Sequence, residues 1–193
     1  MTLKLLITRH GEALGNAKGI LMGVEDGNIT KRGFKQIHKL INRMKREEVD
    51  IILSSDMYRC QVTAKEISKK YNIPIEYSIL LREKNNGDWT GKCYREMCWD
   101  DLEGDFETRH PPDGESLIEV RERGIKFYSE LLTKHTDKCI AIVSHSTFLK
   151  VFIGQLLGMS IYDSIFKLRM DYCSLSKIEI INKNECIVTA INN

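Results

Sequence analysis

The protein is a chain of 193 residues, of which 42% are hydrophobic and 29% are charged. These values are typical of a globular protein and argue against disordered, fibrous and coiled-coil classes. Lys and Arg number 29 and Asp and Glu number 27, so the net charge of +2 argues against nucleic acid as a partner. The length predicts a single domain over residues 1–193.

Neither a membrane helix nor a secretory leader is predicted. The apolar runs at 139–143 and 151–153 are far shorter than the about 18 residues that span a bilayer. Lys4 is followed by only three apolar residues before Thr8, so we expect a cytoplasmic protein. The six cysteines include no CxxC pair and no histidine at metal-finger spacing. We therefore expect free structural thiols and no metal site.

Strands and helices alternate along the first half of the chain. The short apolar runs at 3–7 and 49–53 predict two buried strands. Thr30 is placed to cap a helix whose apolar positions recur at helical spacing, namely Phe34, Ile37, Ile41 and Met44. A second helix follows residues 54–56 and has an apolar stripe of Met57, Cys60, Ala64, Ile67 and Tyr71.

The second half of the chain continues this alternation and closes with two strands. An extended piece at 73–77 precedes residues 84–114, whose weak periodicity predicts a lid-like insertion. The later predicted elements are a helix at 116–134, a strand at 139–143, a helix at 148–157 and two strands joined as a hairpin at 174–181 and 185–191. This pattern predicts a three-layer α/β/α sandwich around a mainly parallel sheet with an antiparallel edge.

Polar residues directly follow three of the predicted strands. These turns are Arg9-His10-Gly11, Ser54-Ser55 with Arg59 in the next helix, and Ser144-His145-Ser146. The carboxyl ends of parallel strands meet at one edge of a sheet, so the three turns should converge there. Arginine side chains and helix N-termini suit phosphate oxygens, which predicts a phosphoryl group as the ligand. The sequence has no P-loop, which argues against nucleotide triphosphate chemistry.

Five segments, in order, resemble the motifs of the histidine phosphatase superfamily, also called phosphoglycerate mutase-like. They are 6–12 (LITRHGE), similar to the RHG signature; 26–33 (DGNITKRG), similar to D-x-x-L-T-x-x-G; 54–64 (SSDMYRCQVTA), similar to S-S-x-x-x-R-x-x-x-T-A; 81–91 (LREKNNGDWTG), similar to L-R-E-x-x-x-G-x-W-x-G; and 143–146 (VSHS), similar to the second-histidine segment. The resemblance covers nearly the whole chain and implies the phosphoglycerate mutase-like fold.

The resemblance implies how the catalytic residues act. His10 would be the nucleophile and would carry the phosphoryl group as a phosphohistidine. Glu83 would protonate the leaving group and then accept a proton from the attacking water. Arg9, Arg59 and a protonated His145 would clamp the phosphoryl oxygens and stabilise the charge of the transition state.

Three further residues are implied to bind substrate. Gly11 would let the backbone approach the phosphate, Asn16 would add a neutral donor, and Ser146 would offer a backbone N–H. Ser146 stands where the family most often has Gly, and Asp56 stands where it commonly has Pro. Asp56 would either cap the following helix or, if it points inward, weaken phosphate binding.

The expected activity is hydrolysis of a small phosphomonoester without a metal or other cofactor. The mutases of the family are longer in the lid and at the C-terminus, so the resemblance favours hydrolysis over bisphosphoglycerate-dependent phosphoglycerate mutase activity. A catalytically silent phosphate-binding module is a second alternative. Such a module would need the arginines but not His10 and Glu83 together.

The composition of the predicted lid bears on the substrate. Its aromatic residues are Trp89, Tyr94, Trp99 and Phe106. They would either stack on a flat leaving group, as in α-ribazole phosphate or another nucleoside-like or sugar monophosphate, or pack as a hydrophobic cluster. The acidic residues of the lid argue against highly anionic substrates. We expect a monomer or homodimer whose partner is a small molecule, with no membrane or nucleic-acid partner.

Overall fold

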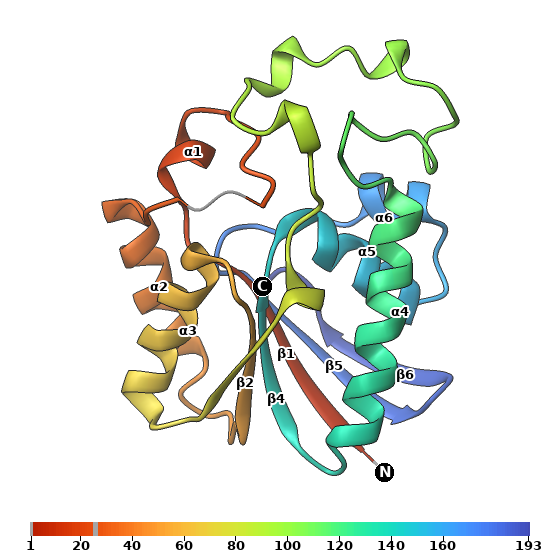
Figure 1. Cartoon of the computed structure of the whole chain (residues 1–193). Helices are drawn as coiled ribbons and strands as arrows, with labels where there is room; N and C mark the ends of the chain where they lie inside the picture. Colours follow the sequence, from red (N-terminus) through yellow and green to blue (C-terminus); the bar gives the residue numbers. More distant parts are fainter. Residues whose placement is uncertain (1, 25–26) are drawn as a thin grey trace.

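A computed structural model describes residues 2–24 and 27–193. Within this part of the chain, one six-stranded sheet has the strand order β3-β2-β4-β1-β5-β6 (Figure 1). The strands are β1 (Leu3–Arg9), β2 (Ile51–Ser55), β3 (Ile75–Ser78), β4 (Cys139–Ser144), β5 (Leu175–Asn182) and β6 (Glu185–Ala190). The strands β1 to β4 are parallel, whereas β5 and β6 pair antiparallel. The predicted sheet with an antiparallel edge is confirmed.

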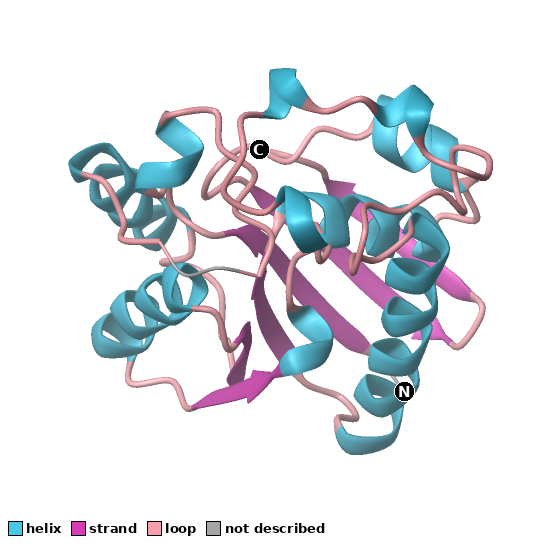
Figure 2. Ribbon diagram, turned by 45° about the horizontal axis from the view of Figure 1, so that its top comes forward, coloured by secondary structure: helices cyan, strands magenta, loops and turns pink. Residues whose placement is uncertain are grey.

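Helices cover both faces of the sheet and complete the predicted three-layer sandwich (Figure 2). After the single turn of α1 (Leu14–Ala17), the helices α2 (Lys31–Arg43) and α3 (Tyr58–Tyr71) pack on one face, and α4 (Leu117–Lys134), α5 (Ser146–Leu156) and α6 (Ile161–Lys167) pack on the other. Successive residues of a strand point to opposite faces. Leu6 accordingly belongs to the cluster under α2 and α3, while Leu5 and Ile7 belong to the cluster under α4 and α5.

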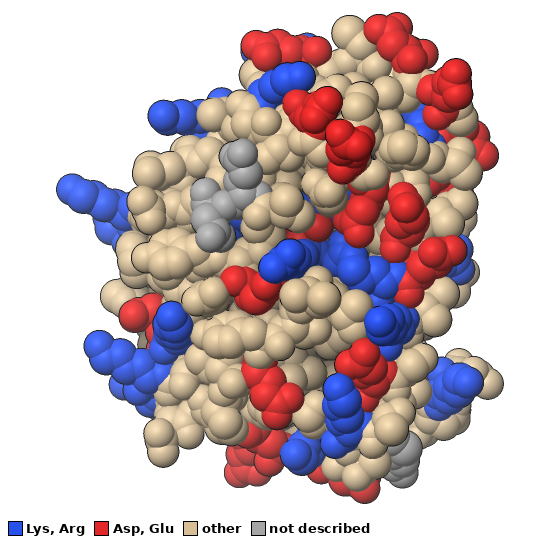
Figure 3. Space-filling model, viewed as in Figure 1, with Lys and Arg blue, Asp and Glu red and all other residues tan. Residues whose placement is uncertain are grey.

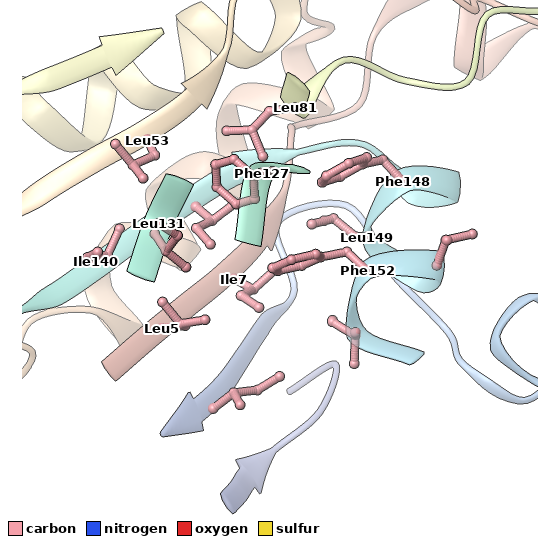
Figure 4. Packing of buried hydrophobic residues seen from close by; sticks show 14 of the residues in the cluster. Leu5, Ile7, Leu53, Leu81, Phe127, Leu131, Ile140, Phe148, Leu149 and Phe152 are labelled. Carbon is pink, nitrogen blue, oxygen red and sulfur yellow. The ribbon is translucent and has the colours of Figure 1, made fainter. Parts of the chain in front are cut away.

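Aromatic rings join two helices over the central strands (Figure 4). Phe127 of α4 lies 5.5 Å from Phe152 of α5 between ring centroids, and Phe148 stacks on Phe152 at 5.7 Å. These rings belong to the same buried cluster as Leu5 and Ile7 of β1. Tightly packed aromatic side chains restrict the movement of the elements that carry them. The carboxyl end of β1 and the N-terminus of α5 are therefore held firmly.

Side-chain caps start two of the helices, and the first of them, at Thr30, is the cap that the sequence predicts. Thr30 Oγ1 accepts a hydrogen bond from the backbone N–H of Gly33 at 2.9 Å and so caps α2. Ser116 caps α4 in the same way, because its Oγ accepts the backbone N–H of Glu119 at 3.2 Å. In return, the Glu119 carboxylate accepts the backbone N–H of Ser116 at 2.7 Å. This reciprocal capping box satisfies two helix donors at once.

Two details of the helices differ from the expectation. Phe34 was expected on the inner stripe of α2 but is 41% exposed, and the buried positions of α2 are Gly33, Ile37, Leu40 and Ile41. The helix α6 was not predicted, because it has only seven residues and leaves Tyr162 and Phe166 exposed. A helix this short and this exposed lacks the apolar periodicity on which prediction depends.

Residues 84–114, which we call the lid, lie over the carboxyl end of the sheet (Figure 1). The lid contains three short 3-10 turns at Gly87–Trp89, Tyr94–Glu96 and Trp99–Asp101. Leu21 joins the lid to the loop after α1, because its N–H donates to Lys92 O at 3.0 Å and its carbonyl accepts from the N–H of Gly91 at 2.8 Å. The lid is thus attached along one side by backbone hydrogen bonds.

The six cysteines all carry free thiols, as the sequence predicts. Cys60 and Cys173 are buried, and burial raises the pKa of the Cys173 thiol to about 12. Among residues 2–24 and 27–193, we find no helix that is both long enough and apolar enough to cross a membrane.

Candidate active site

The three polar turns converge at the carboxyl edge of the sheet, as predicted. Arg9 is paired with Ser144 across β1 and β4, and Ser54 of β2 is paired with Val143. A cavity of about 530 Å³ opens at this edge beneath the lid. Six of the predicted site residues line it, namely Arg9, His10, Asn16, Arg59, Glu83 and Ser146. Asp26, in the motif at 26–33, lies outside the described residues.

His10 is held as a neutral imidazole with a defined tautomer. Its ring is 2% exposed, and its Nδ1 lies 2.7 Å from the carbonyl oxygen of Gly11. A carbonyl only accepts hydrogen bonds, so Nδ1 carries the proton and Nε2 carries the lone pair. Burial, followed by the charges of Arg59 and Arg9, holds the pKa of His10 well below its ordinary value of 6.5. His10 is therefore prepared to act as a nucleophile through Nε2.

Gly11 is required by packing. Its backbone N–H donates to Thr63 Oγ1 at 3.1 Å, and this hydroxyl donates onward to Arg59 O at 2.9 Å. A Cβ atom at Gly11 would lie 3.0 Å from Gly33 O and 3.0 Å from Ile37 Cγ1. The expected approach of the Gly11 amide to a phosphate is not what the structure shows, because this amide is satisfied by Thr63 behind the cavity.

Arg59 enters the cavity from the first turn of α3 and is 1% exposed. Its Nη2 donates to Gly23 O at 2.7 Å, and its Nε donates to His145 Nδ1 at 3.2 Å. Partners on two sides of the guanidinium fix its plane. A fixed guanidinium at the end of three strands is suited to bind the oxygens of a tetrahedral anion.

His145 lies directly behind this arginine and does not line the cavity. Its Nδ1 accepts from Arg59, so its Nε2 carries the proton and donates to Ser55 Oγ at 2.9 Å. Burial and the neighbouring Arg59 charge hold the pKa of His145 well below 6.5. The sequence-based expectation of a protonated His145 therefore does not describe this structure, in which a neutral His145 positions Arg59.

Arg9 approaches the cavity from the end of β1. Its guanidinium carbon lies 3.7 Å from the centroid of the Tyr172 ring, and its Nη1 donates to Met170 O at 3.0 Å. Its Nε is buried and finds no hydrogen-bond partner among the described residues. The stacked guanidinium thus retains donor capacity for a bound anion.

Glu83 is placed by the start of α5. Its carboxylate accepts the backbone N–H groups of Thr147 and Phe148, both at 3.2 Å, and that of Lys84 at 2.9 Å. Helix N-termini favour a negative charge at this position. The carboxylate therefore lies in the cavity wall at a defined place, as an acid and base for a bound substrate requires.

Asp56 does not point toward the anion site. Both of its carboxylate oxygens accept hydrogen bonds from Arg82, one of them from Nε at 2.7 Å. This contact lowers the pKa of Asp56. The residue that caps α3 is Met57, which uses no side-chain hydrogen bond, so the expectation that Asp56 caps this helix is wrong.

The remaining predicted residues occupy the rim of the same cavity. Asn16 lies in α1 and lines the cavity, and its Oδ1 accepts the N–H of Ala13 at 3.4 Å. Ser146 is the first residue of α5 and also lines the cavity. Both positions suit neutral donors toward a bound phosphate.

Aromatic residues of the lid pack together and also line the cavity. Trp99 contacts Trp89 edge to face at 4.8 Å between ring centroids, and Phe106 lies 5.3 Å from Phe166 of α6. Tyr94, Trp99 and Phe106 face the cavity. The two interpretations of these residues are therefore compatible, because one cluster supplies both the packing of the lid and an apolar wall.

The charge of the cavity differs from the charge of the lid surface. Figure 3 shows acidic side chains spread over the outer surface of the lid, and Asp100 is fully exposed. Among residues 2–24 and 27–193, the charged residues that line the cavity are one carboxylate, Glu83, and five cations, namely Arg9, Arg59, Lys84, Arg109 and Lys150. The expectation that the acidic lid disfavours anionic substrates therefore does not follow from the structure.

Sequence reasoning missed several of these residues for identifiable reasons. Thr63 lies within a recognised motif and could have been found there. Lys150 follows Ser146 by one helical turn, a spacing that places both on one side of α5. Lys84 and Tyr172 had no local signal, because neither a lysine after Glu83 nor a tyrosine in a loop has a pattern of its own.

Comparisons with known proteins agree with this geometry. The family model of the histidine phosphatase superfamily (branch 1) matches residues 5–193. The chain is 28% identical over 192 residues to "Phosphoserine phosphatase 1" of Hydrogenobacter thermophilus, covering 96% of this chain and 90% of that protein. It is 28% identical over 183 residues to "Probable phosphoglycerate mutase GpmB" of Yersinia pestis, covering 92% of this chain and 85% of that protein.

A solved structure shows the same arrangement of elements. The α-ribazole phosphatase of Shigella flexneri superposes with a TM-score of 0.89 at 27% identity, covering 98% of this chain and 96% of that one. The family match extends over nearly the whole chain. It therefore includes all six strands of the sheet and the residues that line the cavity. The protein belongs to the histidine phosphatase superfamily.

Proposed function

We propose that this protein is a phosphatase that hydrolyses a small phosphomonoester through a phosphohistidine on His10. The observation that carries this proposal is the neutral His10, whose Nε2 lone pair is available in a cavity that also holds Arg9, Arg59 and Glu83. A nucleophile, an anion clamp and a proton donor are the three components that phosphoryl transfer to a side chain needs.

In the first half of the reaction, His10 Nε2 attacks phosphorus in line with the leaving oxygen. The P–O bond to the leaving group breaks as the P–N bond forms, and Glu83 gives its proton to the departing alkoxide. Arg9 and Arg59 stabilise the charge on the phosphoryl oxygens. His145 acts through Arg59, because its Nδ1 holds the guanidinium Nε at 3.2 Å.

In the second half, water attacks the phosphohistidine. The Glu83 carboxylate accepts a proton from this water, the P–N bond breaks, and inorganic phosphate leaves with His10 again neutral. No step requires a metal ion, because Arg9 and Arg59 stabilise the negative charge on the phosphoryl oxygens. Within the described residues, no group of three or more His, Cys, Asp or Glu side chains is placed to hold a metal.

The size and lining of the cavity support a small substrate. A volume of about 530 Å³ accommodates a phosphoryl group with a leaving group of metabolite size. Relatives named for phosphoserine and α-ribazole phosphate direct the choice of substrates for a first assay. The panel should contain these two compounds, nucleoside and sugar monophosphates, and an aryl phosphate.

The test is release of inorganic phosphate in EDTA by the wild type and by His10→Ala. We expect turnover by the wild type and a loss of at least about 1,000-fold in His10→Ala. Rapid quenching should trap an acid-labile phosphoenzyme that the variant lacks. His38→Ala is the control, since His38 is exposed on α2 and should retain wild-type activity. Equal activity of His10→Ala and wild type would contradict the proposal, and activity restored only by a metal would contradict its metal-free form.

A mutase is the second candidate, favoured by the relative named for phosphoglycerate mutase and by the five cations of the cavity. A mutase would interconvert phosphoglycerates when primed with bisphosphoglycerate and release little phosphate. Absence of both activities would instead support a phosphate-binding module, which should still bind vanadate or phosphate through Arg9 and Arg59.

A further inference from the structure

A loop that follows α6 carries an aromatic partner for the Arg9 side chain. Residues 168–174, which connect α6 to β5 and which we call the Arg9 loop, place Tyr172 beside the end of β1. The guanidinium carbon of Arg9 lies 3.7 Å from the centroid of the Tyr172 ring, within the range of a cation–π contact. Among residues 2–24 and 27–193, Arg9 forms no ion pair with an acidic side chain. The Tyr172 ring is thus the partner that the described residues offer to its charge.

The backbone of the Arg9 loop fixes the position of this ring. The N–H of Cys173 donates to Arg9 O at 3.0 Å, and the carbonyl of Cys173 accepts a hydrogen bond from Arg43 Nη2 of α2. Cys173 is buried and has a φ of 54°, a left-handed conformation that a side chain of this kind keeps only where its surroundings impose it. Tyr172, the preceding residue, is therefore held beside Arg9 by its backbone.

An aromatic face attracts a guanidinium without using its N–H groups. A carboxylate partner would accept some of these groups and would offset the charge that a phosphoryl group needs. In this structure Arg9 Nη1 donates to Met170 O at 3.0 Å, and the buried Nε has no hydrogen-bond partner among the described residues. Arg9 thus combines a fixed plane with a full charge and unused donors. This combination suits a tetrahedral anion in the cavity that Arg9 lines.

We propose that Tyr172 is a positioning residue for phosphoryl transfer, because the face of its ring holds the Arg9 guanidinium at the cavity. The ring acts through Arg9 and makes no contact with the substrate in this role. The proposal rests on the proposed phosphatase function and adds a residue that orients one of its two arginines. It predicts that the electron density of the ring face, and not the Tyr172 hydroxyl, sets the strength of anion binding.

Fluorinated phenylalanines at position 172 test this role, because they weaken the negative face of the ring while nearly keeping its size. Tyr172→Phe should retain anion binding, and one, two and three fluorine atoms should then reduce it stepwise. We expect the Kd of vanadate to rise, and kcat/KM for an aryl phosphate to fall, by about 2- to 30-fold over the series, the range of a cation–π contact. A flat series would overturn the proposal, since a merely packing role depends on size.

The matched control is the same set of phenylalanines at Tyr77. This tyrosine is exposed on the edge strand β3, so these replacements should change neither vanadate affinity nor kcat/KM. Fluorine is little larger than hydrogen, so the variants at both positions avoid the cavity that an alanine would leave. An equal stepwise loss at position 77 would contradict a specific role of Tyr172.

A second background separates Arg9 from another neighbour of the ring. The centroids of the Tyr172 and His10 rings lie 5.9 Å apart, so a change in the ring could also act on the nucleophile. In Arg9→Met the ring has no guanidinium to hold, and the fluorine series should leave vanadate affinity and the residual kcat/KM unchanged. A stepwise loss that persists in Arg9→Met would show that the ring acts on His10, and it would overturn the proposal.

Vanadate binding decides this inference separately from turnover, because it needs neither a leaving group nor a phosphoenzyme. Phosphate release combined with a flat fluorine series would overturn the role of Tyr172 and leave the phosphatase proposal standing. A stepwise loss of vanadate affinity in a protein that hydrolyses no member of the substrate panel would do the reverse. Calorimetry of each variant with vanadate provides the binding measurement.

Discussion

The two buried histidines adopt opposite tautomers, and this difference follows from their partners. His10 donates from Nδ1 to a carbonyl, whereas His145 accepts at Nδ1 from a guanidinium. Nearby arginines and burial disfavour a positive charge on either ring. One histidine is thereby left with a free lone pair on Nε2, as the proposed nucleophile needs, while the other orients Arg59, which we propose binds the phosphoryl group.

Both tautomers can be measured. In ¹⁵N spectra of the ring nitrogens, we expect His10 with its proton on Nδ1, His145 with its proton on Nε2, and both rings neutral well below pH 6.5. Because these pKa values are lowered in the folded state, the unfolded chain binds more protons below about pH 6.5, and stability should fall as the pH decreases through that region. A titration midpoint near 6.5 for either ring would contradict the assignment.

The buried ammonium of Lys84 should destabilise the folded protein. Folding lowers its pKa from 10.5 to about 8, so Lys84→Met should raise the free energy of unfolding at pH 7 by roughly 1 to 3 kcal/mol. This gain should shrink between pH 8 and 10.5, as the wild-type lysine loses its proton in the folded state. Urea unfolding at pH 7 and 10 provides the measurement, with the exposed Lys92→Met as control. A less stable Lys84→Met at pH 7 would show that the ammonium has a partner.

At the scale of elements, the junction between β1 and α2 depends on a close approach of backbones. Gly11 ends the polar turn after β1, and the space beside it is filled by Gly33 O and Ile37 at the start of α2. The same residue accepts the hydrogen bond that sets the tautomer of His10. Any shift of this junction therefore changes both packing and the nucleophile.

A pair of glycine substitutions tests this junction. Gly11→Ala places a Cβ 3.0 Å from backbone and side-chain atoms, so we expect a loss of about 1 to 3 kcal/mol in stability and a fall in kcat. Gly124→Ala is the control, because a Cβ at Gly124 of α4 would meet first the movable side-chain oxygen of Gln155 in α5, at 3.2 Å, and alanine favours a helix. Chemical denaturation and kcat should separate the two. Equal effects would contradict the crowding at Gly11.

At the scale of the whole molecule, the site lies between a rigid layer and a less rigid one. The strands β1 and β4 are each paired on both sides and are covered by helices on both faces. The lid has short 3-10 turns and backbone hydrogen bonds to the loop after α1. The nucleophile and the arginines belong to the first layer, whereas the apolar wall and Lys84 belong to the lid.

Hydrogen exchange should report this difference. Amides of β1 and β4 should exchange only through global unfolding, and those of residues 94–110 should exchange at least about 100-fold faster through local opening. A phosphate analogue such as vanadate, bound at the cavity, should slow exchange in the lid more than in the sheet. Equal protection of the lid and the central strands would contradict this division.

The sequence by itself determined that the sheet is mainly parallel with an antiparallel edge. It also determined the three polar turns and the identity of the residues that meet there. Alternating strands and helices with polar turns are local patterns, and parallel strands necessarily bring their carboxyl ends to one edge. The capping residue Thr30 is local in the same sense, since a cap acts within one turn. The short helices α1 and α6 and the outward Phe34 escaped this reasoning.

Tertiary structure alone decided the protonation, orientation and charge of the site. The neutral state of His145 depends on burial behind Arg59, and the place of Asp56 depends on Arg82, which is 26 residues away. The cationic cavity under an acidic lid depends on which side chains turn inward. These properties arise from contacts between residues distant in the chain, and such contacts set desolvation and local fields that no sequence pattern contains.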